Sequence, residues 1–361
     1  MKYDLFIDRD YMVEILAKLL ATPSPTGMTD EVVGLVCAEL KELDIPFELT
    51  RRGAIRADLK GEEASPDRAI AAHLDTLGAM VKGFRLGGRL EVVPIGHWSS
   101  RFAEGARCTV HSDGGRTFRG TILPAKASGH TYNEAIDTQP TEWSEVELRL
   151  DERVGYEHEV RALGINVGDT ISIDPMTEFM PNGFVFSRHL DDKAGVAALL
   201  AAARAVTRAG TVLPIDCHLL FTITEEVGVG ASAVLGQHTS EYGVTIAMQD
   251  SSGPFDWHLS RSLIDMCVGH GIEHSRDVFR FYRSDAAAAL EAGNDIRTAL
   301  LCFALDASHG YERTHLDSVM ALTRLLTLYM QSKPMFLRDK DALGPLGDLP
   351  ATERDKPAKA A

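Results

Sequence analysis

At 361 residues, the chain is long enough for a full α/β core and a second, smaller domain. Hydrophobic residues make up 45% and charged residues 25%, which is ordinary for a globular protein and excludes a fibre or a largely disordered chain. The net charge is -15, and no basic run is longer than Arg51-Arg52. Neither a nucleic acid nor an anionic membrane surface is therefore an expected partner.

Cysteine usage and the N-terminal residues indicate a cytoplasmic protein. The five cysteines are scattered and never occur as Cys-x-x-Cys, so we expect buried thiols rather than disulfides or zinc-thiolate knuckles. The first ten residues contain acids where a signal peptide needs an apolar core. No run approaches the roughly 20 apolar residues of a membrane span, so no membrane association is expected.

The first 80 residues predict two helices followed by strands. Apolar residues recur at helical spacing over 11–20. Thr29 is the expected N-cap of a second helix, whose buried face would carry Val32, Val33, Val36 and Leu40. A strand, a polar loop at 61–67 and an apolar run at 69–72 follow.

The character of the sequence changes between residues 81 and 182. Glycine is frequent there, and short β-like pieces alternate with turns while long helical periodicity is nearly absent. This pattern predicts a small β-rich domain inserted into an α/β domain. The polar stretch 128–141 is expected to be a surface loop of the insert.

The α/β pattern resumes after the insert, with a helix over 194–206, strands over 217–224 and 242–249, and a last helix over 317–331. The residues after these have little to bury and predict a flexible tail. The expected organisation is a catalytic domain in two parts, 1–80 and 183–335, an insert at 81–182 and a tail at 336–361.

Acidic residues and histidines follow five short apolar runs of this sequence. They are His73 and Asp75, Asp191 and Asp192, Glu225 and Glu226, Asp250, and His309. Ligands of an open α/β sheet bind in the crevice outside the carboxyl ends of the strands, so we expect these segments to converge. Imidazole and carboxylate donors suit a pair of divalent metals, and an extra carboxylate supplies a base. The pattern predicts a two-metal hydrolase.

Each motif also has a purely structural interpretation. Glu225-Glu226 is compatible with a solvated acidic turn, and Asp191-Asp192 with two acids at a helix start. In the functional interpretation one of these two Asp residues is the N-cap and the other is free to bridge two cations. His189 is expected at a surface or a turn, although it is close enough to Asp191 to support it. Only the joint pattern favours the metal site.

The ordered motifs resemble those of the M42 metallo-aminopeptidases, the glutamyl and deblocking type, which are related to the M18 and M20 peptidases. They are Ala72-His-Leu-Asp-Thr-Leu-Gly, Arg188-His-Leu-Asp-Asp-Lys-Ala-Gly, Thr224-Glu-Glu-Val-Gly-Val-Gly-Ala-Ser, Asp250 and Ser308-His-Gly-Tyr-Glu. The resemblance extends over nearly the whole chain. It implies an α/β fold: a mixed-sheet dinuclear-metal peptidase domain with helices on both faces, plus the inserted β-rich domain.

The resemblance also implies two divalent metal ions per subunit, with zinc expected and cobalt or manganese as alternatives. The ligands would be His73, Asp191 and Asp250 for one ion, and Asp191, Glu226 and His309 for the other. Asp191 would thus bridge the ions, and Asp75 would orient His73. Glu225 would be the general base that takes a proton from the water between the metals.

One segment departs from the family pattern. Where the family has a Gly-rich Thr-Asp-Ala segment near the substrate, this chain has Tyr282-Arg-Ser-Asp-Ala. Arg283, Ser284 and Asp285 are therefore candidate substrate-binding residues. The Arg283 guanidinium is either a solvated group or a partner for a substrate carboxylate or carbonyl.

Three functions follow from the resemblance and its departure. The first is an aminopeptidase that removes N-terminal residues from short peptides. The alternative is an amidase or deacylase of N-acylated amino acids or of a modified dipeptide, as in an osmoprotectant pathway, with the same site. The third is a non-catalytic scaffold. The family also implies a homo-oligomer, with a dimer as building block and possible assembly into a hollow dodecamer.

Overall fold

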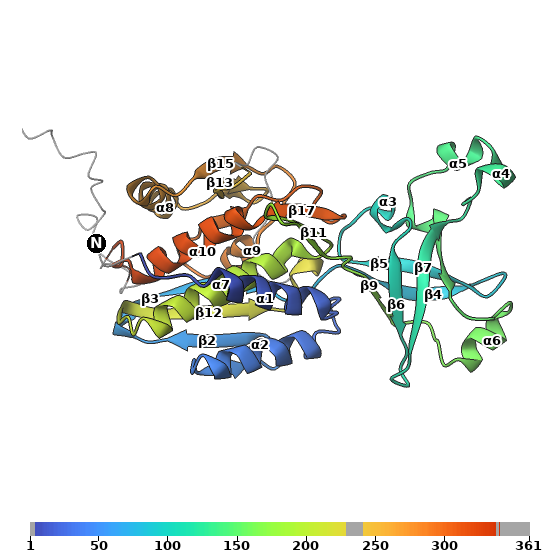
Figure 1. Ribbon diagram of the computed structural model, residues 1–361, viewed down its shortest axis with the longest axis horizontal. Coiled ribbons are helices and arrows are strands. Elements are labelled where there is room, and N and C mark those ends of the chain that lie inside the picture. Colours follow the sequence, from blue (N-terminus) through green and yellow to red (C-terminus); the bar gives the residue numbers. More distant parts are fainter. Residues whose placement is uncertain (1–3, 229–240, 337–338, 340–361) are drawn as a thin grey trace, which may run out of the picture.

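The computed structural model describes residues 4–228, 241–336 and 339. Figure 1 shows helices and open sheets at one end of the molecule and a separate group of strands at the other. The predicted α/β class is confirmed by the mixed helix and strand content. Among the described residues, no helix is long and apolar enough to cross a membrane. The predicted tail at 336–361 lies outside the described residues except for Phe336 and Asp339.

The helices of the α/β part come from both ends of the sequence. They are α1 (Arg9–Ala21), α2 (Asp30–Glu42), α7 (Leu190–Arg208), α8 (Trp257–His270), α9 (Asp285–Glu291) and α10 (Leu316–Gln331). Helix α7 is buried along nearly its whole length because α1 and α10 both pack against it. Its many alanines allow this close approach.

The open sheets contain both parallel and antiparallel pairs. One has the order β1-β2-β12-β3, with β1 (Phe47–Leu49), β2 (Ile55–Leu59), β3 (Gly61–His73) and β12 (Leu213–Thr222). Another contains β13 (Val244–Asp250), β14 (Gly253–Pro254), β15 (His274–Val278) and β16 (Leu300–Phe303). The third consists of β10 (Glu178–Phe179), β11 (Phe184–Ser187) and β17 (Glu312–His315).

The first two helices follow the sequence closely. Helix α1 begins after Asp8, whose side chain accepts a hydrogen bond from the backbone of Tyr11. Helix α2 begins after Thr29, as predicted, and buries all four predicted apolar residues. The Thr29 side chain makes no capping bond, however. Burial of the apolar face rather than a side-chain cap therefore sets the position of α2.

The predicted polar loop at 61–67 is wrong, because β3 starts at Gly61. This part of β3 pairs in parallel with β12, Gly61 opposite Leu213 and Glu63 opposite Ile215. Strand β3 lies at the edge of its sheet, so polar side chains can face solvent while the backbone remains hydrogen-bonded. The polar composition reflects an edge strand.

The strands at the other end of the molecule close into a barrel with its own hydrophobic core. The order is β4-β5-β8-β7-β6-β9, formed by β4 (Gly78–Arg85), β5 (Arg89–Ile95), β6 (Arg107–His111), β7 (Thr117–Pro124), β8 (Val146–Leu150) and β9 (Thr170–Ile173). Buried side chains from alternate positions fill it, among them Val81, Val92, Val110, Ile122 and Leu148. The domain boundaries proposed from the sequence stay predictions.

Short helices lie in the segments between strands of the barrel, namely α3 (Ser100–Ala103), α4 (Gly129–Tyr132), α5 (Ala135–Thr138) and α6 (Glu157–Ala162). Two of them, α4 and α5, occupy the stretch 128–141, which is largely exposed as predicted but contains helical turns. All five cysteines are free, and four are buried.

Candidate metal and catalytic site

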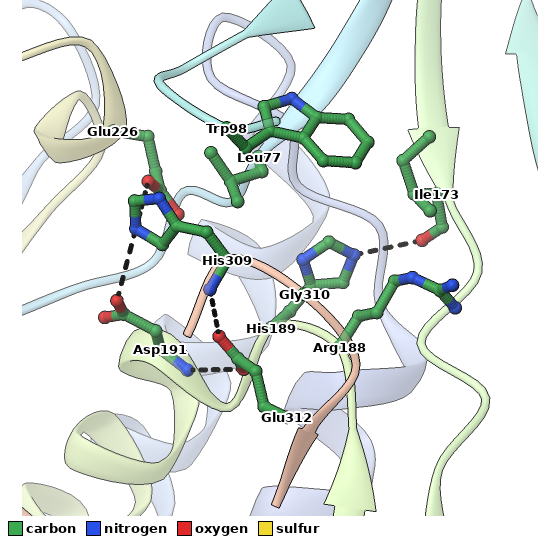
Figure 2. A pocket seen from close by; sticks show the side chains of 10 residues that line it. All are labelled: Leu77, Trp98, Ile173, Arg188, His189, Asp191, Glu226, His309, Gly310 and Glu312. Carbon is green, nitrogen blue, oxygen red and sulfur yellow. Dashed lines mark hydrogen bonds and ion pairs between the residues drawn. The ribbon is translucent and has the colours of Figure 1, made fainter. Parts of the chain in front are cut away.

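The predicted site residues lie at the ends of strands and at one helix start. His73 is the last residue of β3 and Asp250 the last of β13, while Asp191 lies in the first turn of α7. Glu225 and Glu226 begin a short 3-10 turn directly after β12. His309 precedes β17, and Figure 2 shows it between Asp191 and Glu226.

Asp191 lies between two imidazole rings. Its Oδ1 is 3.3 Å from Nε2 of His73, and its Oδ2 is 3.6 Å from Nε2 of His309. Asp191 is 3% exposed and His73 is fully buried. One buried carboxylate thus faces two histidines with separate oxygens, which is the arrangement expected of a bridging ligand.

Backbone carbonyl groups fix the orientation of both rings. His73 Nδ1 donates to the carbonyl of Asp75 at 2.8 Å, and His309 Nδ1 donates to the carbonyl of His97 at 2.8 Å. Since a carbonyl oxygen only accepts, both Nδ1 atoms carry hydrogen, and in the neutral rings Nε2 holds the lone pair. Both lone pairs then face the oxygens of Asp191, so a proton or a metal cation between them is required for a favourable contact.

The pKa shifts of the two histidines agree with this requirement. Burial alone would lower the pKa of His73, but hydrogen bonds to Asp191 and Asp75 and the charge of Glu225 raise it well above its usual value. Burial would also lower the pKa of His309, but the hydrogen bond to Asp191 and the charges of Glu226 and Asp191 raise it to about 10. The site thus favours positive charge at both Nε2 positions.

Glu226 and Glu312 complete the environment of His309. Glu226 Oε2 is 3.6 Å from His309 Nε2, and burial raises the pKa of Glu226 well above its usual range. Glu312 accepts hydrogen bonds from the backbones of His309 and Asp191 at 3.0 and 3.2 Å. It therefore holds two predicted ligands in place, a role that the sequence interpretation missed although Glu312 belongs to the His309 motif.

Asp75 supports the acidic pair rather than only His73. Its carboxylate accepts from the backbone N–H groups of Glu225 and Glu226 at 3.1 and 3.3 Å, and from the Thr26 hydroxyl at 2.7 Å. The contact that fixes His73 comes from the Asp75 carbonyl, while Oδ1 is 3.6 Å from His73 Nδ1. Asp75 thus couples the end of β3 to the turn after β12.

Glu225 lies next to His73 and is partly exposed to solvent. Its Oε2 is 3.8 Å from His73 Nε2, and its side chain is 11% exposed, unlike the more deeply buried Asp191. A carboxylate that is next to the predicted ligands and still reaches solvent can exchange protons with water.

Asp250 makes other contacts in this structure. Its Oδ2 accepts from both the backbone N–H and the hydroxyl of Ser284, at 2.9 and 2.6 Å, and its Oδ1 accepts from the backbone of Ser252. Among the contacts described, none joins Asp250 to His73. These hydrogen bonds hold the Asp250 carboxylate in place and leave lone pairs on its oxygens, so they are compatible with the predicted ligand role.

The segment that departs from the family pattern leads into α9. Ser284 is the N-cap of this helix. The Arg283 guanidinium pairs with Glu291 at an exposed position, as expected if it is a solvated group rather than a partner for the substrate. Asp285 is buried, and burial together with the charge of Glu225 raises its pKa to about 7. Asp285 is thus a candidate substrate-binding residue that is electrostatically coupled to Glu225.

The start of α7 agrees in part with the predictions. Its regular helical turns begin after Asp191 and Asp192, whose backbone angles are non-helical, although the element as a whole begins after His189, which makes no side-chain capping bond. His189 has a left-handed backbone conformation, as at a turn, and is half-buried: its Nε2 donates to the carbonyl of Ile173 at 3.0 Å, and burial lowers its pKa to about 3. Contact with β9 of the barrel explains its position.

A narrow pocket of about 10 Å³, enough for roughly one water molecule, adjoins the predicted ligands (Figure 2). Asp191, Glu226 and His309 line one side, and Leu77, Trp98 and Ile173 add apolar groups. The space beside Asp191, Glu226 and His309 thus fits water rather than a substrate side chain.

The donor set fits divalent cations in type and charge, because two neutral imidazoles face several buried carboxylates. As they stand, no three His, Cys, Asp or Glu side chains in the described part of the chain are arranged to hold a metal ion. The histidine–carboxylate distances of 3.3 to 3.6 Å are nonetheless those expected between two ligands of one tetrahedral ion with bonds of about 2.0 to 2.2 Å, so the pairs need not separate for ions to bind.

The comparisons with known proteins identify the family. The model for the M42 glutamyl aminopeptidase family matches residues 53–241 and 236–325. A Bacillus subtilis protein named "Putative aminopeptidase YhfE" is 37% identical over 337 residues, covering 89% of this chain and 97% of that protein. The chain belongs to the M42 family. It is accordingly a peptide-bond hydrolase of the aminopeptidase type.

Less similar proteins extend the comparison. The lysyl aminopeptidase of Pyrococcus furiosus is 25% identical over 67% of this chain and 68% of its own length. An aminopeptidase from the archaeon Desulfurococcus kamchatkensis superposes with a TM-score of 0.81 at 22% identity, over 93% of this chain and 99% of that chain. The Pyrococcus horikoshii TET1 peptidase is described as able to assemble into a tetrahedron or a large octahedral shell. It superposes with a TM-score of 0.76 at 21% identity, over 88% of this chain and 99% of that chain. Both structures share the fold of this chain.

Gly96 provides a test of how the barrel supports the site. Its φ is +84°, and a Cβ there would lie 2.5 Å from Leu77 Cδ2 and 3.2 Å from the carbonyl oxygen of Glu226. We expect Gly96→Ala to displace Glu226 and lower kcat/KM about tenfold, a barrier change of about 1.4 kcal/mol. Gly105→Ala is the matched control, because Gly105 has a φ of +77° but nothing within 4 Å of the added Cβ. Equal losses in both variants would show that backbone strain alone matters.

Proposed function

We propose that the chain is a metal-dependent aminopeptidase that removes N-terminal residues from short peptides. The observation that carries this proposal is the position of Asp191, with one oxygen toward each of two imidazoles whose Nδ1 atoms are held by backbone carbonyls. In an M42 chain this arrangement supports a dinuclear site.

Two divalent ions would be held by His73, Asp191 and Asp250, and by Asp191, Glu226 and His309. Zinc is the expected metal, with cobalt and manganese as alternatives, because all three accept imidazole and carboxylate donors. Such ions polarise the scissile carbonyl and make water a stronger acid.

Glu225 would act as the general base. Its carboxylate lies beside His73 and reaches solvent, so it can accept a proton from the attacking water and later donate it to the leaving amine. Asp75 would keep Glu225 and Glu226 in place through their backbone N–H groups. Glu312 would do the same for Asp191 and His309.

Substrate would approach the site along the narrow pocket of Figure 2, which would have to widen to admit it. Leu77, Trp98 and Ile173 give it an apolar wall beside the site, suited to an uncharged part of the peptide. Because Trp98 and Ile173 belong to the barrel region, the insert would contribute to substrate binding as well as to subunit contacts.

Assembly into a homo-oligomer is part of the proposal. Structural neighbours are described as a dodecamer and as a tetrahedron or a large octahedral shell, and the predicted building block here is a dimer. Enclosure in such a particle would restrict substrates to short peptides. A cytoplasmic location remains the expectation from the sequence.

The decisive experiment is hydrolysis of a panel of free and N-acylated short peptides by metal-stripped protein reloaded with zinc, cobalt or manganese. We expect activity to require metal and a free N-terminal amine. Turnover of blocked substrates alone would establish the deacylase alternative in place of the aminopeptidase. Metal-bound protein without any turnover would favour the scaffold.

A further inference from the structure

Tyr282 stands in the segment where the family has glycines, and it brings a phenol to the site. Its hydroxyl donates to Glu225 Oε1 at 3.5 Å. This distance is long for a hydrogen bond, but contacts of catalytic groups are often long before substrate binds.

The two oxygens of Glu225 face different partners. Oε1 is the acceptor for Tyr282, whereas Oε2 is 3.8 Å from His73 Nε2. A carboxylate held at one oxygen by a neutral donor presents the other in a fixed direction. That direction is toward the predicted metal ligands.

The Tyr282 ring is well anchored. It packs edge-to-face on Phe279, with ring centroids 5.9 Å apart, and contributes to a small apolar cluster beneath β13 and β16. Its backbone carbonyl accepts from Ser251 at 2.8 Å, next to Asp250. Burial raises the pKa of the phenol well above its usual value, and the charge of Glu225 acts in the same direction, so Tyr282 remains a hydrogen-bond donor.

We propose that Tyr282 is a positioning residue for the general base: its hydroxyl holds Oε1 of Glu225 and thereby directs Oε2 toward the reacting water. The proposal rests on the proposed function, because it gives Tyr282 a role only if Glu225 is the base.

Tyr282→Phe removes the hydroxyl and keeps the ring. We expect kcat to fall about tenfold with KM and metal content unchanged, because the lost bond acts on a charged group that works in the transition state. Tyr11→Phe is the matched control. Tyr11 also donates to a glutamate, Glu39 at 3.3 Å, but between α1 and α2, which carry no predicted site residue.

A double-mutant cycle with Glu225→Gln separates positioning from a structural role. If Tyr282 acts through Glu225, the double variant should have the kcat of Glu225→Gln alone, and the Tm changes of the two single variants should not add. A further tenfold loss in the double variant, or an unchanged kcat in Tyr282→Phe, would overturn the proposal. Absence of turnover by wild-type protein would instead overturn the proposed function, and the positioning role with it.

Discussion

Glu225→Gln should lower kcat about 10³-fold while both metals remain bound, since general acid–base catalysis typically contributes 10²- to 10⁴-fold. Glutamine keeps the size of the side chain but cannot accept the proton of the attacking water. The ligands assigned to the metals are other residues, so metal content should stay at the wild-type value. Steady-state kinetics beside metal analysis of the same samples measures both quantities.

The backbone supports this separation of roles. The N–H of Glu225 is held by Asp75, independently of the Glu225 side chain, so the substitution should leave the turn after β12 in place. KM should therefore change little, because substrate binding does not depend on the proton transfer. Glu62→Gln on the exposed face of edge strand β3 is a suitable control for loss of a carboxylate.

A different result would redefine the site. If Glu225→Gln lost metal together with activity, Glu225 would be a ligand rather than a base. If kcat fell less than tenfold, another group would have to accept the proton. Asp285 would be the first candidate, because it is buried and electrostatically coupled to Glu225.

The sequence predicts the elements whose signal is local. Helices α1 and α2 follow from apolar spacing. Four predicted ligands that are far apart in the chain, His73, Asp191, Glu226 and His309, are joined by contacts of 3.3 to 3.6 Å. The polar stretch 61–67 was predicted to be a loop but belongs to β3, because polar residues occur both in loops and in edge strands. Composition alone does not distinguish the two.

The supporting groups of the site were much less predictable. The carbonyl of His97 fixes the His309 ring, and a backbone carbonyl has no residue signature. Glu312 was visible in the motif, but only the fold shows that it holds the backbones of Asp191 and His309. The contact of Tyr282 with Glu225 also depends on how β13 and α9 are placed.

The choice of Asp191 over Asp192 as the bridge leads to the second large effect. Asp191→Asn should lower activity by about 10³-fold or more, since loss of metal assistance removes several kcal/mol of transition-state stabilisation. It should also reduce the number of metal ions bound per subunit. Asparagine offers one oxygen and no charge to two sites that each use an oxygen of Asp191.

Asp192→Asn is the contrasting variant. Asp192 is fully buried and accepts only from the backbone of His73 among its described hydrogen bonds, at 3.2 Å. Burial raises its pKa well above the usual range, so the neutral acid is favoured and asparagine resembles it in charge and shape. Two metals should remain bound, with activity within about tenfold of wild type.

Metal analysis by plasma mass spectrometry and kinetics on both variants would decide between the two aspartates. Equal metal loss in both would indicate that the pair acts as one unit. Loss of metal only in Asp192→Asn would indicate that Asp192, and not Asp191, bridges the two metals. Since the two imidazoles face separate oxygens of Asp191, and the described hydrogen bonds of Asp192 include only a backbone N–H, the geometry favours loss at Asp191 alone.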